Sequence, residues 1–300
     1  MLQPENPANT SILVNINGKI LPRHEAGVSP FDSSVQNGDA VWEGLRLYDG
    51  RIFRLDAHLA RLRLSAAHLQ YQGMPDDATL VAELRRTLAA NEMRDKVHIR
   101  LTVSRGIKYT SGLDPRINQR GCSFFILAEH KSPVYDNAAG IRLITARQRR
   151  PFANVLDQHI HSCNQLTSIL AKLEANAADA DDSLMLDTED MLAETNAAHV
   201  FIVRDGIVHT STTRACPDGI TRAAVIELCA LHGQACEIRN IPAEELSAAD
   251  EMFITGTMGE ITPVARLDQH HFGPGPVTST IAGWFRTLTR DPAQGTLVVD

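Results

Sequence analysis

The feature that most constrains the fold is an alternation of short strand-like segments with segments of helical periodicity. The chain opens on a hairpin signal, because strand-like residues 11–16 and 19–21 flank the tight-turn pair Asn17-Gly18. Apolar residues then recur at helical spacing over residues 55–69, and Asp56 is the expected N-cap. Strands and helices alternate through both halves without a clear parallel βαβ repeat. This pattern predicts an α+β fold made of two mixed α/β domains.

Further elements follow from the same two periodicities. The expected additional helices cover residues 77–90, 165–177 and 221–232. The expected additional strands cover residues 97–103, 123–128, 141–145, 183–187, 199–204, 207–209 and 251–256. The polar segment 131–137 contains Pro133 and is the expected linker. We therefore expect an N-terminal domain at residues 1–133 and a C-terminal domain at residues 134–300.

Composition and charge argue against several kinds of partner. The net charge is -7 and the pI about 5.9, so a nucleic-acid phosphate backbone is an unfavourable partner. No apolar run approaches the roughly 20 residues of a transmembrane helix, and the polar start of the chain lacks the apolar region of a signal peptide. The five cysteines are irregularly spaced and include no CxxC pair. We therefore expect a cytoplasmic protein that binds neither nucleic acid nor membrane.

Three stretches of the second half carry residues suited to binding a charged ligand. Gly219-Ile220-Thr221 is expected to open a helix, whose free N–H groups and threonine hydroxyl form an anion site. Thr255-Gly256-Thr257 places hydroxyls and flexible backbone at a strand end, where they can complete a phosphate cup. The third stretch, residues 193–196, supplies the carboxylate of Glu194. Taken singly, each has an ordinary explanation as a helix N-cap or an exposed acidic residue.

Taken together and in this order, these stretches resemble the class IV aminotransferases, the fold-type IV pyridoxal-phosphate enzymes. In the first half the resemblance includes Trp42-Glu43-Gly44-Leu45-Arg46 and His58-Leu59-Ala60-Arg61-Leu62. It implies two mixed α/β domains with a cofactor pocket between them, and pyridoxal or pyridoxamine phosphate as the cofactor. It also implies an amino acid or amine as the substrate, and a homodimer.

The resemblance assigns roles to matching positions. Arg61 matches an arginine that binds the cofactor phosphate, and Glu194 matches the carboxylate that pairs with the pyridine nitrogen. Ile220 and Thr221 match the phosphate contacts at a helix start, and Thr257 matches a hydroxyl of a second loop. A carboxylate at the pyridine nitrogen favours the protonated ring, which then acts as an electron sink.

Four further positions are expected on the substrate side of the pocket. Arg46 and Arg100 fall where family members often place polar groups, although a strand arginine such as Arg100 can also face solvent. His199 stands where the family usually has asparagine, and Gln165 stands where branched-chain enzymes often have a tyrosine. Two such departures indicate that the pocket has changed at more than one position.

The family's Schiff-base lysine is replaced by His161 within residues 157–166. The five lysines of the chain are Lys19, Lys96, Lys108, Lys131 and Lys172. None of them is a convincing substitute, and Lys108 is the least excluded because it lies in a loop. Imidazole forms no stable Schiff base but is a usable base near neutral pH. We therefore expect noncovalent cofactor binding, with His161 as the proton-transfer base.

Two other functions stay open on the sequence alone. One is an enzyme repurposed to work in the same cavity without the cofactor, in which His159, His161 and His199 act as acid–base groups or metal ligands. The spacing of the three histidines is not diagnostic of a metal, so we expect no metal site. The other is a non-catalytic binding or regulatory protein.

Overall fold

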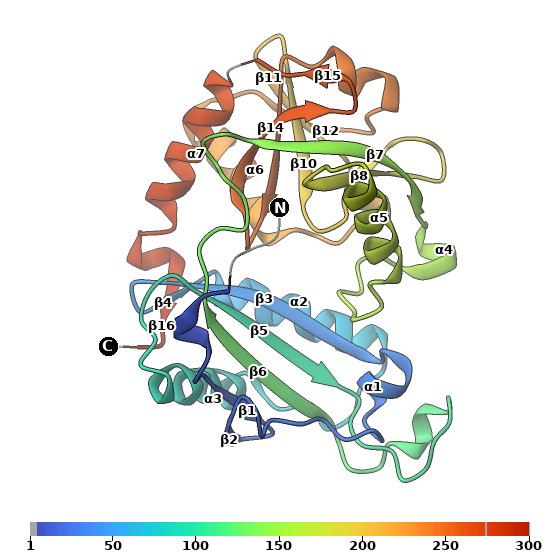
Figure 1. The fold of residues 1–300 in the computed structure, drawn as a ribbon, viewed down its shortest axis with the longest axis vertical. Helices are drawn as coiled ribbons and strands as arrows, with labels where there is room; N and C mark the ends of the chain where they lie inside the picture. Colours follow the sequence, from blue (N-terminus) through green and yellow to red (C-terminus); the bar gives the residue numbers. More distant parts are fainter. Residues whose placement is uncertain (1–4, 274, 300) are drawn as a thin grey trace. The chain divides into compact units, whose positions relative to one another are not determined.

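The computed structural model describes residues 5–273 and 275–299 as two compact units. Among the described residues, the N-terminal unit comprises 5–132, 160–164 and 289–299, and the C-terminal unit comprises 133–159, 165–273 and 275–288. Each unit combines one large sheet with helices, as Figure 1 shows, which agrees with the predicted pair of mixed α/β domains. Within the described residues, no helix has the length and apolar character needed to cross a membrane.

The N-terminal unit is built on a seven-stranded antiparallel sheet with the order β16-β4-β3-β5-β6-β1-β2. Asn17 and Gly18 have φ angles of 51° and 80°, which confirms the predicted tight turn between β1 and β2. The strands are β1 (Leu13–Ile16), β2 (Lys19–Pro22), β3 (Ala40–Tyr48), β4 (Arg51–Phe53), β5 (Val97–Ser104), β6 (Ser123–His130) and β16 (Gly295–Leu297). The helices are α1 (Ser33–Asn37), α2 (Leu55–His68) and α3 (Asp77–Ala90), with 3-10 turns at Pro7–Asn9, Pro115–Ile117 and Pro292–Gln294.

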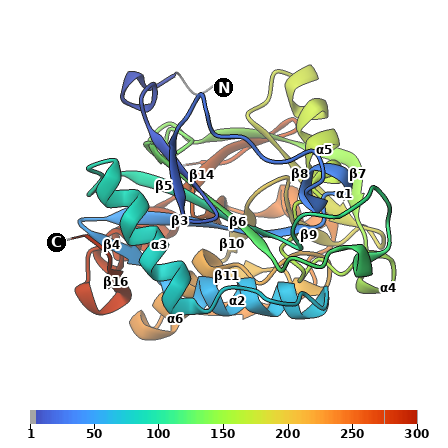
Figure 2. The same cartoon turned by 90° about the horizontal axis from the view of Figure 1, so that it is seen from below.

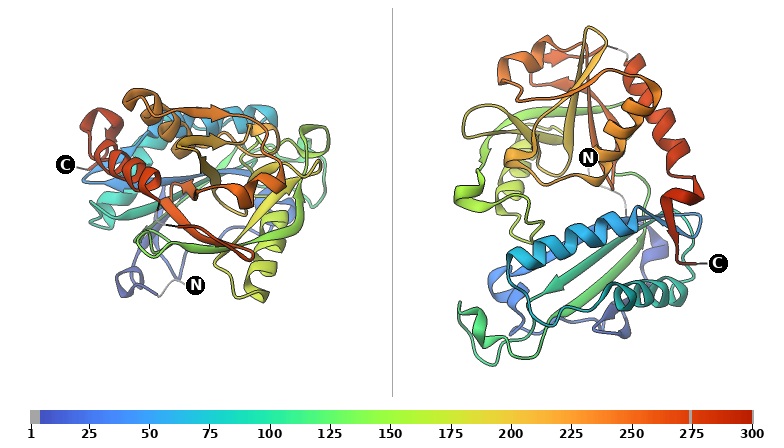
Figure 3. Two further views of the ribbon diagram at one scale, coloured as in Figure 1. Left: turned by 90° about the horizontal axis from the view of Figure 1, so that it is seen from above. Right: turned by 180° about the vertical axis from the view of Figure 1, so that it is seen from behind.

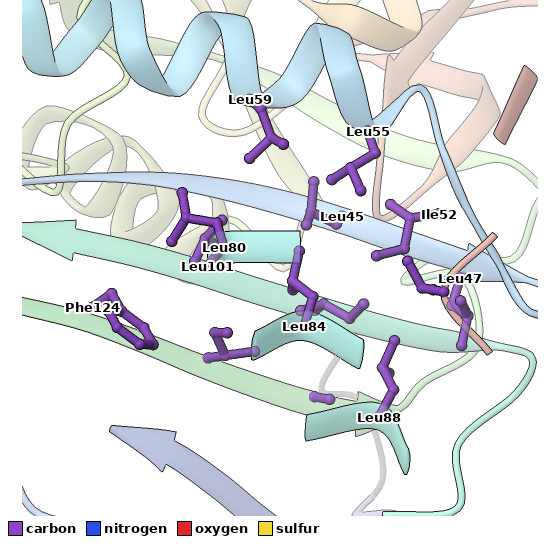
Figure 4. Close-up of a cluster of buried hydrophobic side chains, with 14 of the residues drawn as sticks. Leu45, Leu47, Ile52, Leu55, Leu59, Leu80, Leu84, Leu88, Leu101 and Phe124 are labelled. Carbon is purple, nitrogen blue, oxygen red and sulfur yellow. The ribbon is translucent and has the colours of Figure 1, made fainter. Parts of the chain in front are cut away.

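Helices α2 and α3 run alongside this sheet (Figure 2; Figure 3, right). The buried side chains between these helices and the sheet form the hydrophobic core of the unit. Leucines at helical spacing on both helices meet alternate residues of β3 and β5, as the labelled side chains of Figure 4 show. The expected N-cap of α2 was wrong. Arg54, with φ 49°, occupies that place without a side-chain cap, and Asp56 lies in the first helical turn. There its negative charge interacts favourably with the positive end of the helix dipole.

Residues 160–164 lie along the edge of β3. The Trp42 N–H donates to the His161 carbonyl at 3.1 Å, and the Cys163 N–H donates to the Ala40 carbonyl at 2.8 Å. This edge is open because β4 pairs only with Leu47 and Tyr48 at the far end of β3. His159 lies in a turn of the C-terminal unit, and His161 lies outside the named strands.

The C-terminal unit is built on a sheet with the order β12-β11-β10-β13-β14-β7-β8-β9, and β15 pairs with β14. Its strands are β7 (Ile141–Arg150), β8 (Asp182–Asp187), β9 (Leu192–Thr195), β10 (His199–Arg204), β11 (Ile207–Thr210), β12 (Cys236–Ile238), β13 (Glu251–Gly256), β14 (Glu260–Leu267) and β15 (His270–His271). Its helices are α4 (Ala153–Leu156), α5 (Leu166–Ala177), α6 (Ile220–His232) and α7 (Pro276–Leu288), with 3-10 turns at Thr213–Ala215 and Ala243–Ala248.

Two parallel crossovers in this sheet were not predicted. Helix α5 connects β7 to β8, and α6 connects β11 to β12, and both strand pairs are parallel. Strands β9 and β14 and helix α7 were also missed. The start of α7 is capped by the Glu251 carboxylate, which accepts from the N–H groups of Val277 and Thr278. Each crossover brings the start of a helix to the carboxyl end of the preceding strand, a common location for ligand sites.

Candidate functional site

In the N-terminal unit, a buried carboxylate on β3 organises the region around His161. The Glu43 carboxyl accepts from Arg61 Nε at 2.9 Å and Arg61 Nη2 at 2.7 Å, and from His58 Nδ1 at 2.6 Å. Both partners lie on α2, and the Glu43 side chain is fully buried. Burial alone would raise the pKa of the Glu43 carboxyl, but Arg61 and the two histidines His161 and His58 hold it well below its usual value. Glu43 is therefore an anion at neutral pH.

The His161 side chain is fixed at its Nδ1 edge. Nδ1 lies 2.5 Å from the Trp42 carbonyl oxygen and 3.6 Å from Glu43 Oε1, so the carbonyl is the direct partner. The ring stacks on the Trp42 ring at a centroid separation of 4.4 Å, and the backbone N–H donates to the Ser65 hydroxyl. Burial, followed by the Arg61 charge, lowers the pKa of His161 below its usual value, against the opposing effect of Glu43. The imidazole is therefore neutral at pH 7.

The two arginines expected on the substrate side lie on the sheet face that carries Trp42. The Arg100 guanidinium lies 3.9 Å from the centroid of the Trp42 ring and donates to Cys163 Sγ at 3.6 Å. Arg46 is buried and pairs in register with His98 across β3 and β5. Burial, Lys131 and the two arginines lower the pKa of His98 to about 3. This face thus combines two cations with a neutral imidazole.

Two of the lysines considered in the sequence as possible Schiff-base residues are bound to other groups. Lys172 Nζ donates to the Asp182 carboxylate at 2.7 Å and to the Asp181 carbonyl. Lys108 Nζ, in the N-terminal unit, donates to the Gly112 carbonyl at 2.6 Å and to Asn37. Each ammonium group is therefore bound to fixed acceptors within its own unit.

In the C-terminal unit, two side-chain hydrogen bonds and an ion pair connect Gln165 to Glu194. The Glu194 carboxylate on β9 lies 3.0 Å from Arg150 Nη2, and both side chains are buried. The same Arg150 nitrogen donates to the Ser168 hydroxyl at 2.9 Å, which in turn donates to Gln165 Oε1 at 3.1 Å. The structure therefore connects two predicted site residues through Arg150. Arg150 was missed because it is one of two successive arginines, and only tertiary structure shows which of them is buried.

The predicted phosphate contacts lie at the start of α6 and in the turn after β13. Gly219 is the N-cap of α6 and has no side chain to cap the helix, so the N-cap residue does not compete for the first N–H groups, those of Ile220 and Thr221. Thr257 is half-buried in the turn between β13 and β14. The Thr255 hydroxyl is buried and has no hydrogen-bond partner among the described residues. These groups form a set of donors suited to an anion.

His199 lies against the start of α6. A Cβ placed on Gly219 would stand 2.3 Å from His199 Cδ2, so the imidazole occupies the space that a side chain at 219 would need. His199 Nδ1 is 3.8 Å from the Cys216 sulfur, and His199 pairs with Thr255 across β10 and β13. Burial and then the Glu194 charge raise the pKa of the Cys216 thiol well above its usual value. Cys216 and His199 are therefore neighbours at the start of α6. In the described residues no group of three or more His, Cys, Asp or Glu could hold a metal ion.

Comparison with known proteins assigns this arrangement to a family. The model of the amino-transferase class IV family matches residues 40–267. The Branched-chain-amino-acid aminotransferase-like protein 1 of Arabidopsis thaliana is 46% identical over 95% of this chain, and the match covers 52% of that relative. The chain therefore spans about half the length of the curated relative it matches.

Two solved structures have the same fold. The branched-chain aminotransferase of Thermoproteus uzoniensis with norvaline has a TM-score of 0.89 and 29% identity, covering 96% of this chain and 100% of that chain. The branched-chain amino acid aminotransferase of T.th. with pyridoxamine 5'-phosphate has a TM-score of 0.89 and 30% identity, covering 96% and 99%. The predicted fold-type IV architecture is confirmed by this similarity.

Proposed function

Because the chain belongs to the class IV aminotransferase family, we propose that it binds pyridoxal or pyridoxamine phosphate noncovalently and acts on an amino acid or amine. The observation that carries this proposal is that one unit holds both the buried Glu194–Arg150 ion pair and the start of α6. There the His199 ring lies against Gly219, and its Nδ1 is 3.8 Å from the Cys216 sulfur. The proposed cofactor-binding residues are Glu194, Ile220, Thr221 and Thr257, with Arg61 as a fifth.

The residues present fit a phosphate and a pyridine ring. The α6 start offers uncapped N–H groups, and the Thr255 hydroxyl is a buried polar atom that a phosphate oxygen would satisfy. Arg150 pairs with Glu194 and orients its carboxylate, which can accept a hydrogen bond from a protonated ring nitrogen. When bound, the cofactor supplies an electron sink for negative charge on the substrate carbon. Arg61 is assigned to the phosphate by the resemblance, and its guanidinium also pairs with Glu43.

His161 is the proposed proton-transfer base in the absence of a lysine. Its imidazole is neutral at pH 7 because burial and Arg61 lower its pKa, and a neutral ring can accept a proton. Lys108 and Lys172 are bound to acceptors of their own units, while Lys19 and Lys96 are exposed. The proposed substrate-side groups are Arg46, Arg100, His199 and Gln165.

A homodimer and a cytoplasmic location complete the proposal. Helix α5 turns four large aliphatic side chains to solvent at helical spacing: Leu166, Ile169, Leu170 and Leu173, which are 66%, 55%, 37% and 57% exposed. The charged residues of this helix are engaged within the chain, since Lys172 binds Asp182 and Glu174 accepts from the backbone of Arg147. An uncharged stripe can pack against its own copy about a two-fold axis without like-charge repulsion. The described cysteines are free thiols, which suits a reducing compartment.

The test is the cofactor chemistry of the purified protein. We expect cofactor absorbance that is released on denaturation, and no lysine adduct by peptide mass spectrometry after borohydride treatment. His161→Gln should lose amine turnover by about 10²-fold or more, whereas the control His159→Gln should not. An adduct on any lysine would refute the lysine-free site. Protein without cofactor, or with cofactor and no turnover of any amine, would favour the two alternative functions instead.

A further inference from the structure

The Nδ1 edge of His161 faces only hydrogen-bond acceptors among the described residues. The Trp42 carbonyl oxygen, at 2.5 Å, has no proton to give. Glu43, at 3.6 Å, is ionised because its pKa is held well below the usual value, so it has no proton to give either. A nitrogen between two acceptors is stable only if it carries hydrogen. The proton on Nδ1 is therefore fixed, and the nitrogen that titrates is Nε2.

We propose that Glu43 is a positioning residue that, together with the Trp42 carbonyl, holds His161 with its proton on Nδ1 and leaves Nε2 as the atom that takes and returns the substrate proton. This inference rests on the proposed role of His161 and names the atom and the residue that make that role work. In the step itself, the carbon–hydrogen bond of the substrate breaks and its electron pair stays with the substrate. The proton forms a bond to Nε2, and the reverse transfer returns it.

The charges around the ring explain why a carboxylate is needed. The charged groups that act on His161 are Arg61 from α2 and Glu43 from β3, and His58 from α2 contacts Glu43. Arg61 disfavours a second positive charge, so an imidazolium beside it would be costly without compensation. Glu43 supplies that compensation at 3.6 Å from Nδ1, the same ring edge that bears the fixed proton. The carboxylate thus stabilises the protonated ring that forms during the transfer.

The carboxylate is itself held rigidly. Two parallel bonds from Arg61 fix the plane of the Glu43 carboxyl, and His58 closes the remaining side of Oε2. The His161 ring is fixed from the other direction by stacking on Trp42, with an interplanar angle of 26°. The orientation of Nε2 therefore follows from contacts that β3 and α2 provide to the ring and to Glu43. This arrangement has the logic of a carboxylate that orients a catalytic histidine.

The direct test is nitrogen NMR of the purified protein labelled with ¹⁵N-histidine, with His161 assigned by the signal lost in His161→Gln. We expect the neutral form to show hydrogen on Nδ1 and none on Nε2. A His161 signal with hydrogen on Nε2 at neutral pH would overturn the proposal.

The second arm measures the titration midpoint of His161 in Glu43→Gln. Removing the anion leaves the Arg61 charge uncompensated, so the midpoint should fall by about one pH unit or more. A midpoint that stays or rises overturns the role of Glu43. If Glu43→Gln does not fold, Glu43→Asp replaces it, and its more distant carboxylate should lower the midpoint by a smaller amount. His58→Asn is the matched control, because it removes a partner of Glu43 and should leave the tautomer of His161 unchanged.

The two proposals fail separately. If His161→Gln abolishes amine turnover while the NMR shows the opposite tautomer, the proposed function stands and the Glu43 inference falls. If the tautomer and the midpoint shift are found but His161→Gln keeps full turnover, the positioning inference stands as a structural statement and the proposed base is wrong. The pH profile of turnover separates the cases further, because its acidic limb should move with the His161 midpoint in Glu43→Gln.

Discussion

Replacing Gly219 by alanine tests how the C-terminal unit builds the start of α6. A Cβ at this position would stand 2.3 Å from Cδ2 and 2.4 Å from Nε2 of His199, far inside van der Waals contact. Gly219 has a φ of -75° and a ψ of 125°, which alanine adopts without strain. The cost of the substitution is therefore entirely steric, and either the His199 ring or the first turn of α6 must move.

The size of the effect follows from this clash. Overpacking a well-packed site costs about 1–3 kcal/mol. For a cooperative unit of this size each kcal/mol lowers Tm by about 2–4 °C, so Gly219→Ala should lower the Tm of the C-terminal unit by about 2–12 °C. Scanning calorimetry is the assay, since it can separate the transitions of two units that do not unfold together.

A double-mutant cycle decides whether the His199 ring is the cause. In a His199→Ala background the alanine at 219 should cost clearly less, because the His199 ring is gone and only Arg222 Cβ, at 3.1 Å, is left as a close neighbour. Gly273→Ala is the matched control, since a Cβ there would meet nothing within 4 Å. An equal loss of Tm in both backgrounds would refute the contact between His199 and the start of α6.

Three further predictions follow from the same structure. Arg150→Gln should destabilise the protein by about 3–5 kcal/mol in denaturant unfolding, because it breaks a buried ion pair, whereas Arg149→Gln, which breaks a half-buried arginine's pair with the exposed Asp190, should cost about 1 kcal/mol or less. Equal losses would contradict this. Ile169→Gln should shift the mass measured by light scattering from two chains to one, and Leu231→Gln, the control at another exposed aliphatic residue, should not. Glu43 has a lowered pKa, so its stabilising contribution is present above its unfolded value near 4.5 and is lost as pH falls toward its folded value. Acid unfolding of Glu43→Gln should therefore be less steep below pH 4.5 than that of the unsubstituted protein.

Short sequence motifs predicted those elements whose stability depends on residues close together in the chain. The Asn17-Gly18 turn fixed the first hairpin, because both residues adopt the positive φ that such a turn requires. The helix Asp77–Ala90 was predicted at its observed bounds, and Asp76 caps it by accepting from the Thr79 N–H. These features depend on residues within a few positions of one another. A sequence pattern is sufficient in such cases because no distant partner contributes.

Elements whose stability comes from distant partners were missed or misplaced. The parallel pairing of β7 with β8 depends on α5 crossing between them, and no local pattern distinguishes it from an antiparallel arrangement. Asp56 looked like an N-cap, but the chain already enters the helix at Leu55. The helix α7 begins on a cap supplied by Glu251, a residue 26 positions earlier in the chain.

The sequence by itself determined which chemical groups the protein has available: the ordered motifs that predicted the family, and the histidine at position 161 that we propose as the base. Only the tertiary structure decided the state of those groups. The Trp42 carbonyl lies 119 positions from His161 in the chain and 2.5 Å from it in space, and the Glu43 charge beside it is held by α2. Arg150 and Glu194 meet in the same way, through sheet pairing across the C-terminal unit. A side chain's proton and charge depend on its neighbours in space, because burial and nearby charges set its pKa, and those neighbours are chosen by the fold.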